Sequence, residues 1–475
     1  MRKRIVSLIV AALLLVCVLG AFCACESYKA DPIANPGNKN AVVESNGGLV
    51  VKQGDYLYFV NGYSDYLSTS GKDNWFGNVV KGAIVRVSYN GGALGDDYTI
   101  VVPKSVMASS ANVGFSIFGE WIYYVSPSAE EDRSGAVQTD TLQFLRTKLD
   151  GTDTQLILEW DNTSVQYKYT ASALVYYDSA ENEIYSKDLS AKKFKASDKG
   201  TCIAEKVSSV HFIKNETYDP AVTETPIADY VLYTKNSEET YENTNTLFAV
   251  DPLGKDTKTV ISPDKFTSGK YSVSVLASSV DDGKLAIYYT KSTYVGTSSS
   301  GTVVGTYAYR FADKKLTFVE TNEVKLSSSE LSSLSPLGYS AGIVKTGSNA
   351  VIYYTDKPAV SYGELSLSTL LTVQNGYFYY LNSDNVIQYY PLDKAGNAHY
   401  AYTTGEKVMT SFTGAEYFGG YLYFIQDDDY DYMARIKLSD IDIYSGKDAV
   451  VTRVAIVTAD DQTKMEEAEE DDSDK

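Results

Sequence analysis

One short element, four residues long and rich in tyrosine, recurs along most of the chain. It reads YLYF from Tyr56, WIYY from Trp121, LVYY from Leu174, YVLY from Tyr230, AIYY from Ala286, VIYY from Val351, YFYY from Tyr377 and YLYF from Tyr421. The first residues follow one another at intervals of 65, 53, 56, 56, 65, 26 and 44. A period of this size constrains the fold more than any local motif, because each repeat must be one supersecondary unit.

Each of these elements is followed by a segment in which polar and apolar residues alternate. The segments are AIVRVSYNG from Ala83, FLRTKLDGTD from Phe144, EIYSKDLS from Glu183, TLFAVDPLGKD from Thr246, TYAYRFADKK from Thr306, GELSLST from Gly363, VIQYYPLDKAGN from Val386 and MARIKLSD from Met433. Several continue through a turn into a third apolar stretch, such as TIVV from Thr99. Such alternation without a sustained helical period indicates antiparallel sheet. Sheets that are apolar on both faces must pack on one another, so we expect an all-β chain forming a single β-propeller of four-stranded blades.

The interval of 26 residues is too short for a complete blade. After GELSLST only residues 369–374 precede the next tyrosine-rich element, which is enough for one strand where two are needed. We therefore expect eight blades with the sixth truncated, and a ring of seven blades is the alternative.

The composition narrows the classes of function. The chain has 475 residues, 61 Asp and Glu against 42 Lys and Arg, and a net charge of −19. Such an acidic chain is a poor partner for nucleic acid. It contains 41 Tyr but only 2 His and 4 Cys, which favours sheet over a metalloenzyme.

The N-terminus resembles the signal of a bacterial lipoprotein. MRKR is followed by an apolar run to Ala24, and the ending VLGAFCAC places a small residue before Cys25. This resemblance implies that residues 1–24 are a signal peptide and that Cys25 is acylated. A secreted protein cut nearby or an uncleaved helix are the alternatives, and all three place the remainder outside the cytoplasm. We expect a lipid anchor on the extracytoplasmic face of the cell membrane, as in a Gram-positive organism.

The flanking segments complete the expected domain organisation. Residues 25–44 are rich in Pro, Asn, Gly and Lys and are expected to form a flexible tether. The propeller is expected over residues 45–459, and residues 460–475 form an acidic run typical of a disordered tail. With Cys25 acylated, Cys202 has no intramolecular disulfide partner and is expected to be a buried apolar residue.

The repeat resembles the low-density-lipoprotein-receptor-like propeller found in bacterial cell-surface proteins. RTKLDGTDTQLI, from Arg146 to Ile157, matches its strand ending in Leu-Asp-Gly-Thr best. The Tyr-Trp-Thr-Asp tetrad of that family is absent from every repeat, and the family is usually six-bladed. The resemblance covers about residues 47–459 and implies a binding module without catalytic residues.

The long connections between the second and third strands of the blades are candidate ligand sites. They comprise residues 61–82, 126–141, 235–245 and 291–305. Their aromatic residues are Trp75, Phe76, Tyr66, Tyr241 and Tyr294, which would stack on a sugar or a peptide. The alternative for Trp75 and Phe76 is a plug that packs back onto the blade.

Motifs for metal binding or catalysis are weak. The cluster QDDDYDY places Asp427, Asp428, Asp429 and Asp431 in one loop, but no Gly or distal Glu completes a calcium loop, so a charged hairpin is favoured. His211 and His399 lie in strand-like alternation. No GxSxG, HExxH, CxxC or Walker pattern occurs, and we expect no cofactor and no metal.

We therefore expect a lipid-anchored cell-surface module that binds a protein, or a cell-wall or environmental glycan. The alternative is a propeller hydrolase or lyase acting on polysaccharide through carboxylates that meet at the ring axis.

Overall fold

The computed structural model describes most of the strand-rich part of the chain. The described residues are 32–62, 82–106, 114–128, 141–161, 164–214, 216–235, 246–261, 271–281, 284–295, 298–310, 315–319, 333–337, 341–346, 349–354, 359–362, 367–392, 401–409, 415–426, 433–441 and 454–455. They form eight antiparallel sheets, two 3-10 turns and no α-helix. The described residues contain no helix that is long and apolar enough to span a bilayer.

The first four sheets follow one another along the chain. Sheet 1 contains β2 (Val50–Gln53), β3 (Tyr56–Val60), β4 (Ile84–Asn90) and β6 (Thr99–Val102), with β5 (Ala93–Leu94) paired to the end of β4. Sheet 2 contains β7 (Ser116–Phe118), β8 (Trp121–Pro127), β9 (Leu142–Lys148) and β10 (Gln155–Trp160). Sheet 3 contains β11 (Gln166–Tyr169), β12 (Ala173–Asp178), β13 (Glu183–Asp188) and β14 (Thr201–Ala204). Sheet 4 contains β15 (Val207–Phe212), β17 (Val231–Lys235), β18 (Leu247–Val250) and β19 (Thr257–Ile261), with the 3-10 turn η2 (Ile227–Asp229) before β17.

The remaining four sheets have the same plan. Sheet 5 contains β20 (Tyr271–Asp281), β21 (Lys284–Val295), β22 (Ser298–Arg310) and β23 (Lys315–Val319). Sheet 6 contains β24 (Ser335–Pro336), β25 (Ala341–Thr346), β26 (Asn349–Tyr354) and β27 (Val360–Tyr362). Sheet 7 contains β28 (Thr369–Gln374), β29 (Tyr377–Leu381), β30 (Val386–Pro391) and β31 (Tyr402–Lys407). Sheet 8 contains β32 (Glu416–Phe418), β33 (Tyr421–Ile425), β34 (Met433–Lys437) and β35 (Val454–Ala455), with the 3-10 turn η4 (Leu438–Asp440) after β34.

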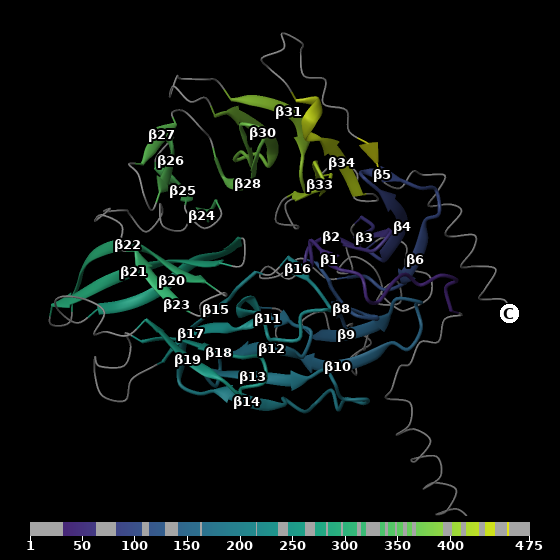
Figure 1. The fold of residues 1–475 in the computed structure, drawn as a ribbon, viewed down its shortest axis with the longest axis horizontal. Helices are drawn as coiled ribbons and strands as arrows, with labels where there is room; N and C mark the ends of the chain where they lie inside the picture. The colour runs from purple at the N-terminus through teal and green to yellow at the C-terminus, as the bar shows by residue number, and fades with distance from the viewer. Residues whose placement is uncertain are drawn as a thin grey trace, which may run out of the picture.

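The sheets are arranged around a common centre, with the first strand of each sheet on the inside (Figure 1). This is a β-propeller, so the expected all-β fold of four-stranded antiparallel sheets is confirmed. Each tyrosine-rich element lies in a strand, and in seven of the eight sheets it is the second strand from the centre. Those strands are buried on both faces because apolar clusters form between successive sheets, as β29 illustrates with all five residues buried.

Sheet 6 departs from this plan. Its tyrosine-rich strand β26 is the third from the centre, because the two-residue β24 is added on the inside. The strand expected at GELSLST is instead β27, which ends at Tyr362. Only β28 lies between that strand and β29, so the sequence was right that one strand occupies residues 369–374, and it belongs to sheet 7.

The connection expected as a loop over residues 291–305 is largely strand. β21 continues to Val295 and β22 starts at Ser298, and the two pair along their whole length. Alternating Thr, Val, Ser and Tyr residues extend the hairpin because they suit a pleated sheet, and this overrides the polarity that had indicated a loop.

Antiparallel pairing gives the ring two distinct faces. The first strand turns into the second at Gly54, Gly119 and Ala171 in sheets 1 to 3, and the third turns into the fourth on the same side. We call this side the turn face. The connections between second and third strands, such as Ser179 to Asn182, emerge on the opposite side, which we call the loop face.

The expected flexible tether is wrong for residues 32–44, which are packed against sheets 1 and 2. The Ile33 amide donates to the Asp150 carbonyl at 2.9 Å. Arg86 donates to the carbonyls of Ala34 and Asn35 at 3.0 and 2.8 Å. Polar tether-like composition did not reveal these contacts, because they are made mostly by backbone carbonyls that every residue carries.

After this segment the chain enters the centre of the ring. β1 (Val43–Glu44) pairs with β2, and on its other side with β16 (Thr217–Tyr218), which comes from the connection between β15 and β17. The first sheet is thereby extended inward by two short strands. This pair links sheet 1 to sheet 4 across the centre (Figure 1).

An arginine on the third strand recurs at three junctions. Arg86, Arg146 and Arg435 lie 4.4, 4.2 and 4.2 Å from the ring centres of Tyr56, Trp121 and Tyr421, each the first residue of a tyrosine-rich strand. Each guanidinium then donates to backbone carbonyls of the adjoining segment. The cation is thus held by a ring on one side and fixed acceptors on the other.

The last of these arginines closes the ring between sheets 8 and 1. Arg435 donates to the Gly92 carbonyl at 3.0 Å. Nearby, the rings of Tyr89 and Phe418 lie 5.9 Å apart. In the described residues no strand is exchanged between sheets 8 and 1, so closure depends on side chains.

Candidate functional site

The centre of the ring contains a cavity of about 1030 Å³. It is lined by the first strands of six sheets and by residues 45–49, which precede β2. This is the volume of a site for a small ligand or a peptide end. The partly exposed rings of Phe118, Phe212 and Tyr417 contribute apolar surface, whereas the charged groups come from Lys168, Lys214, Glu216, Asp229 and Glu416.

Glu416 connects sheet 8 to the N-terminal segment inside the cavity wall. Its carboxylate accepts hydrogen bonds from the Ser45 hydroxyl, from the Leu49 amide at 2.5 Å and from the Val50 amide at 3.2 Å. Burial raises the pKa of Glu416 to about 7, although Lys214 and the three donors act in the opposite direction. A Cβ on Gly48 would overlap this carboxylate, which explains why the position suits glycine.

Lys214 and Glu216 form an ion pair within the cavity, with Nζ and Oε1 3.0 Å apart. The Lys214 side chain is 69% exposed although it lines the cavity, so its ammonium group is available to a ligand. Burial lowers the pKa of Lys214, but the carboxylates of Glu216 and Glu416 outweigh it and the net shift is upward. The pair therefore stays charged at neutral pH.

Lys168 and Asp229 form a second pair that is more deeply buried. Lys168 Nζ lies 3.8 Å from Asp229 Oδ1 and also donates to the carbonyls of Ile213 (2.7 Å) and Ala228. Burial lowers the pKa of Lys168 to about 8 despite the nearby carboxylate. These contacts fix the connection that carries β16 to the inner strand of sheet 3.

His211 is a structural residue, as its strand-like surroundings had predicted. It lies in β15, and its Nε2 is 2.8 Å from Ser278 Oγ of sheet 5. Burial, and secondarily Lys168, lower its pKa to about 4. A neutral histidine bonded to a hydroxyl of the next sheet fits inter-sheet packing.

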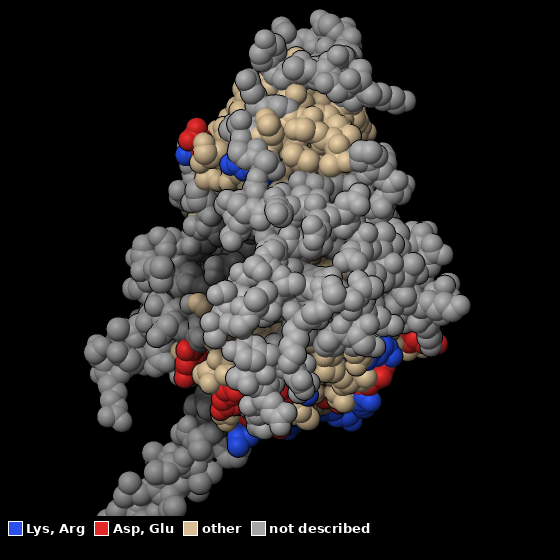
Figure 2. All heavy atoms as spheres, turned by 90° about the vertical axis from the view of Figure 1, so that its left-hand side faces the viewer, with Lys and Arg blue, Asp and Glu red and all other residues tan. Residues whose placement is uncertain are grey.

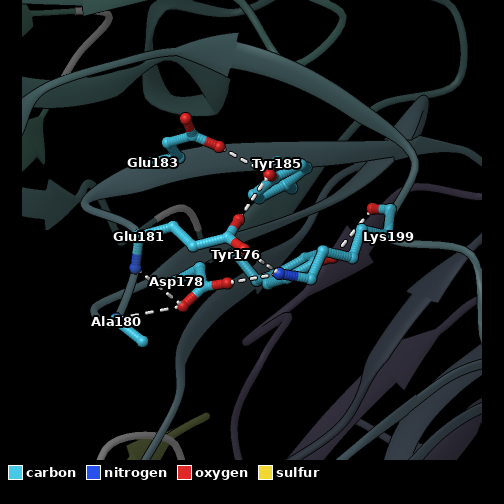
Figure 3. A network of polar contacts seen from close by, with 7 residues as sticks. All are labelled: Tyr176, Asp178, Ala180, Glu181, Glu183, Tyr185 and Lys199. Atoms are coloured by element: carbon cyan, nitrogen blue, oxygen red, sulfur yellow. Dashed lines mark hydrogen bonds and ion pairs between the residues drawn. The ribbon is translucent and has the colours of Figure 1, made fainter.

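A separate polar network lies on the outer part of sheet 3 (Figure 3). Lys199 Nζ lies 2.8 Å from Asp178 and 2.9 Å from Glu181, while the Tyr185 hydroxyl donates to Glu181 and Glu183 at 2.7 and 2.5 Å. These contacts connect β12, β13 and the segment before β14. They stabilise the edge of the sheet.

Cys202 is half-buried rather than buried as expected. Its Sγ and the carboxylates of Glu183 and Glu205 lie within 4.8 Å of one another. Burial raises the pKa of its thiol, and the two carboxylates raise it further. The uncharged thiol and the exposed Glu205 make this cluster a poor metal site.

Charge on the outer surface is mixed. Seen from the side of sheets 4 and 5, the described acidic and basic residues are interspersed along the lower edge (Figure 2). The net negative charge is therefore not gathered into a single acidic patch on that described surface.

The structure does not test the aromatic residues proposed from the sequence. Trp75, Phe76, Tyr66 and Tyr241 lie outside the described residues. The backbone of Tyr294 lies in β21 opposite Ser299, and its side chain is not described. Cys25 and the cluster from Asp427 to Asp431 are also outside the described part of the chain.

Sequence reasoning missed the residues that line the cavity. They are not adjacent in sequence, and one group comes from residues 45–49, which looked like the end of a tether. The Gly47-Gly48 pair was the one available signal, since neighbouring glycines permit close approach of another group.

No protein-family model matches this sequence, and neither does any curated protein. Solved propeller structures are similar at low identity. AztD from Citrobacter koseri is 10% identical over 79% of this chain and 92% of its own, with a TM-score of 0.33. BamB from Moraxella catarrhalis is 11% identical over 85% and 98%, with a TM-score of 0.36. Sqt1 from Saccharomyces cerevisiae is 9% identical over 87% and 94%, with a TM-score of 0.36.

Proposed function

We propose that this protein is an exported, lipid-anchored propeller that binds a protein or a glycan at the cell surface. The anchor is supported by the lipobox-like sequence ending at Cys25. The binding role is supported by a ring of sheets around a central cavity that offers both aromatic surface and charged groups.

The state of the cavity carboxylates favours binding over hydrolysis. Each of the three that line the cavity already has a partner: Glu416 binds a hydroxyl and two amides, Glu216 pairs with Lys214, and Asp229 pairs with Lys168. A glycosidase needs two carboxyl groups aimed at one bond, one of them as acid and the other as base or nucleophile. Carboxylates held in structural contacts suit a rigid receptor instead.

The test is capture of ligands by the mature protein on beads. The parent would be compared with Lys214→Met/Glu216→Gln, which removes both charges of the cavity pair without changing net charge. Lys437→Met/Asp440→Asn is the matched control, because it removes an exposed pair 4.0 Å apart on the outside of sheet 8. Solubilised membranes and cell-wall fractions are the two probes.

We expect the parent and the control to retain the same component and the cavity variant to lose it. Equal capture by all three would place the binding surface elsewhere on the propeller. Release of sugar fragments from the cell-wall fraction by the parent would contradict the binding role in favour of the polysaccharide enzyme.

A further inference from the structure

The N-terminal segment reaches the propeller on one particular face. Ile33 is hydrogen-bonded to Asp150, in the turn between the third and fourth strands of sheet 2. Its side chain also lies against Gly151 of that turn. Further along, Asn38 and Ala41 lie beside Gly54, in the first turn of sheet 1. All of these turns belong to the turn face.

The chain available between that face and a lipid is short. Seven residues separate Cys25 from Pro32, the first described residue. Fully extended, they reach roughly 25 Å. A sheet about six residues tall spans some 20 Å, so the loop face cannot approach the bilayer while the tether stays attached to the turn face.

We propose that the turn face of sheets 1 to 3 lies against the bilayer and that the loop face is the surface presented to soluble partners. The proposal rests on the lipid anchor in the proposed function. The occupant of the turn face is the lipid headgroup layer, and the long connections from 61, 128 and 235 leave the described strands on the side away from it.

Three lysines on the turn face of sheet 3 have the charge that suits anionic headgroups. Lys192, Lys193 and Lys195 are exposed in the segment between β13 and β14. The described residues show no ion pair for these three ammonium groups, whereas Lys39 and Lys148 on the same face pair with Glu120 and Asp153. The lysines would add a local attraction that the net charge of the chain does not predict.

Orientation can be measured by energy transfer from a labelled cysteine to acceptors in the headgroup layer. The two positions are Ala171→Cys and Ala180→Cys, which are exposed alanines at opposite ends of β12. They lie on the turn face and the loop face, roughly 30 Å apart along the strand. The full lipidated chain would carry Cys202→Ser, so that one thiol remains, and would be reconstituted in phosphatidylglycerol/phosphatidylcholine vesicles.

We expect several-fold more transfer from position 171 than from position 180. Equal transfer at both positions, or more from position 180, would overturn the proposal. If the chain is not acylated at Cys25 and does not remain with the vesicles, the anchor itself fails, which mass spectrometry of the N-terminal peptide reports separately. Lys192→Glu/Lys193→Glu/Lys195→Glu should reduce the difference between the two positions, while an unchanged difference would exclude the lysines from headgroup contact.

Discussion

Arg146 offers the strongest test of how neighbouring sheets are held together. Its guanidinium donates to the carbonyls of Leu189 and Ala191 in sheet 3 at 2.7 and 3.0 Å. It also binds Gln155 through two nitrogens and lies over the rings of Trp121 and Phe194. The change to test is Arg146→Met, which keeps an apolar side chain of similar length and removes the donors.

The cost follows from the contacts that are lost. Two buried carbonyls lose a charged donor, at about 1.5 kcal/mol each, and loss of the ring contact adds about 1 kcal/mol. The total is about 4 kcal/mol of unfolding free energy, which corresponds to a drop of about 5 °C in Tm for a domain of this size. Arg146→Lys should lie between the parent and Arg146→Met, because it keeps the charge but not the planar fork.

Urea unfolding followed by tyrosine and tryptophan fluorescence measures this difference. Lys148→Met is the matched control, since Lys148 lies on the same strand, faces the same Trp121 ring and pairs with Asp153 at 2.9 Å at the surface. It should cost less than about 1 kcal/mol. If Arg146→Met destabilises the protein no more than Lys148→Met, the arginine contacts do not hold sheets 2 and 3 together.

Three further outcomes are expected. Because the pKa of Glu416 is raised to about 7 from its usual 4.5, the stabilising effect of its bound proton is complete below about pH 4.5 and disappears as the pH rises through 7; the Glu416→Gln variant should therefore lose less unfolding free energy than the parent between those values, and parallel pH profiles would contradict this. Gly48→Ala should destabilise the protein by about 2 kcal/mol because its Cβ displaces the Glu416 carboxylate, and combining it with Glu416→Ala should cost less than the two single changes added together, whereas strict additivity would show that the two residues do not interact. Since burial and two carboxylates raise the pKa of Cys202, its thiol should react with iodoacetamide at pH 8 at least fivefold more slowly, on the order set by its lower thiolate fraction, in the folded protein than in urea, and equal rates would be inconsistent with that environment.

The fold was accessible from the sequence because it depends on a periodic pattern. A strand such as YFYY from Tyr377 is buried on both faces, and burial between two sheets requires this kind of composition at every repeat. The position of β26 in its sheet was not accessible, because the added inner strand β24 has only two residues and no distinctive composition.

The site was less accessible for a different reason. Lys214, Glu216 and Glu416 meet only after the ring has formed, and each is an ordinary charged residue in its own segment. The arginines on the third strands show a middle case. Each stands directly opposite an aromatic residue on the second strand, as Arg146 does opposite Tyr123, so the pairing follows from register once the strands are known.

The pairing of β1 with β16 also has a consequence for the order of folding during synthesis. At roughly 5 to 20 residues per second, Tyr218 leaves the ribosome on the order of ten seconds or more after Val43, its partner in this pair. Until then the inner edge of the first sheet has unpaired amide and carbonyl groups, which are open to wrong pairing with another chain. The nascent N-terminal half therefore depends on a holding factor, or on prompt arrival of the fourth sheet, to avoid aggregation.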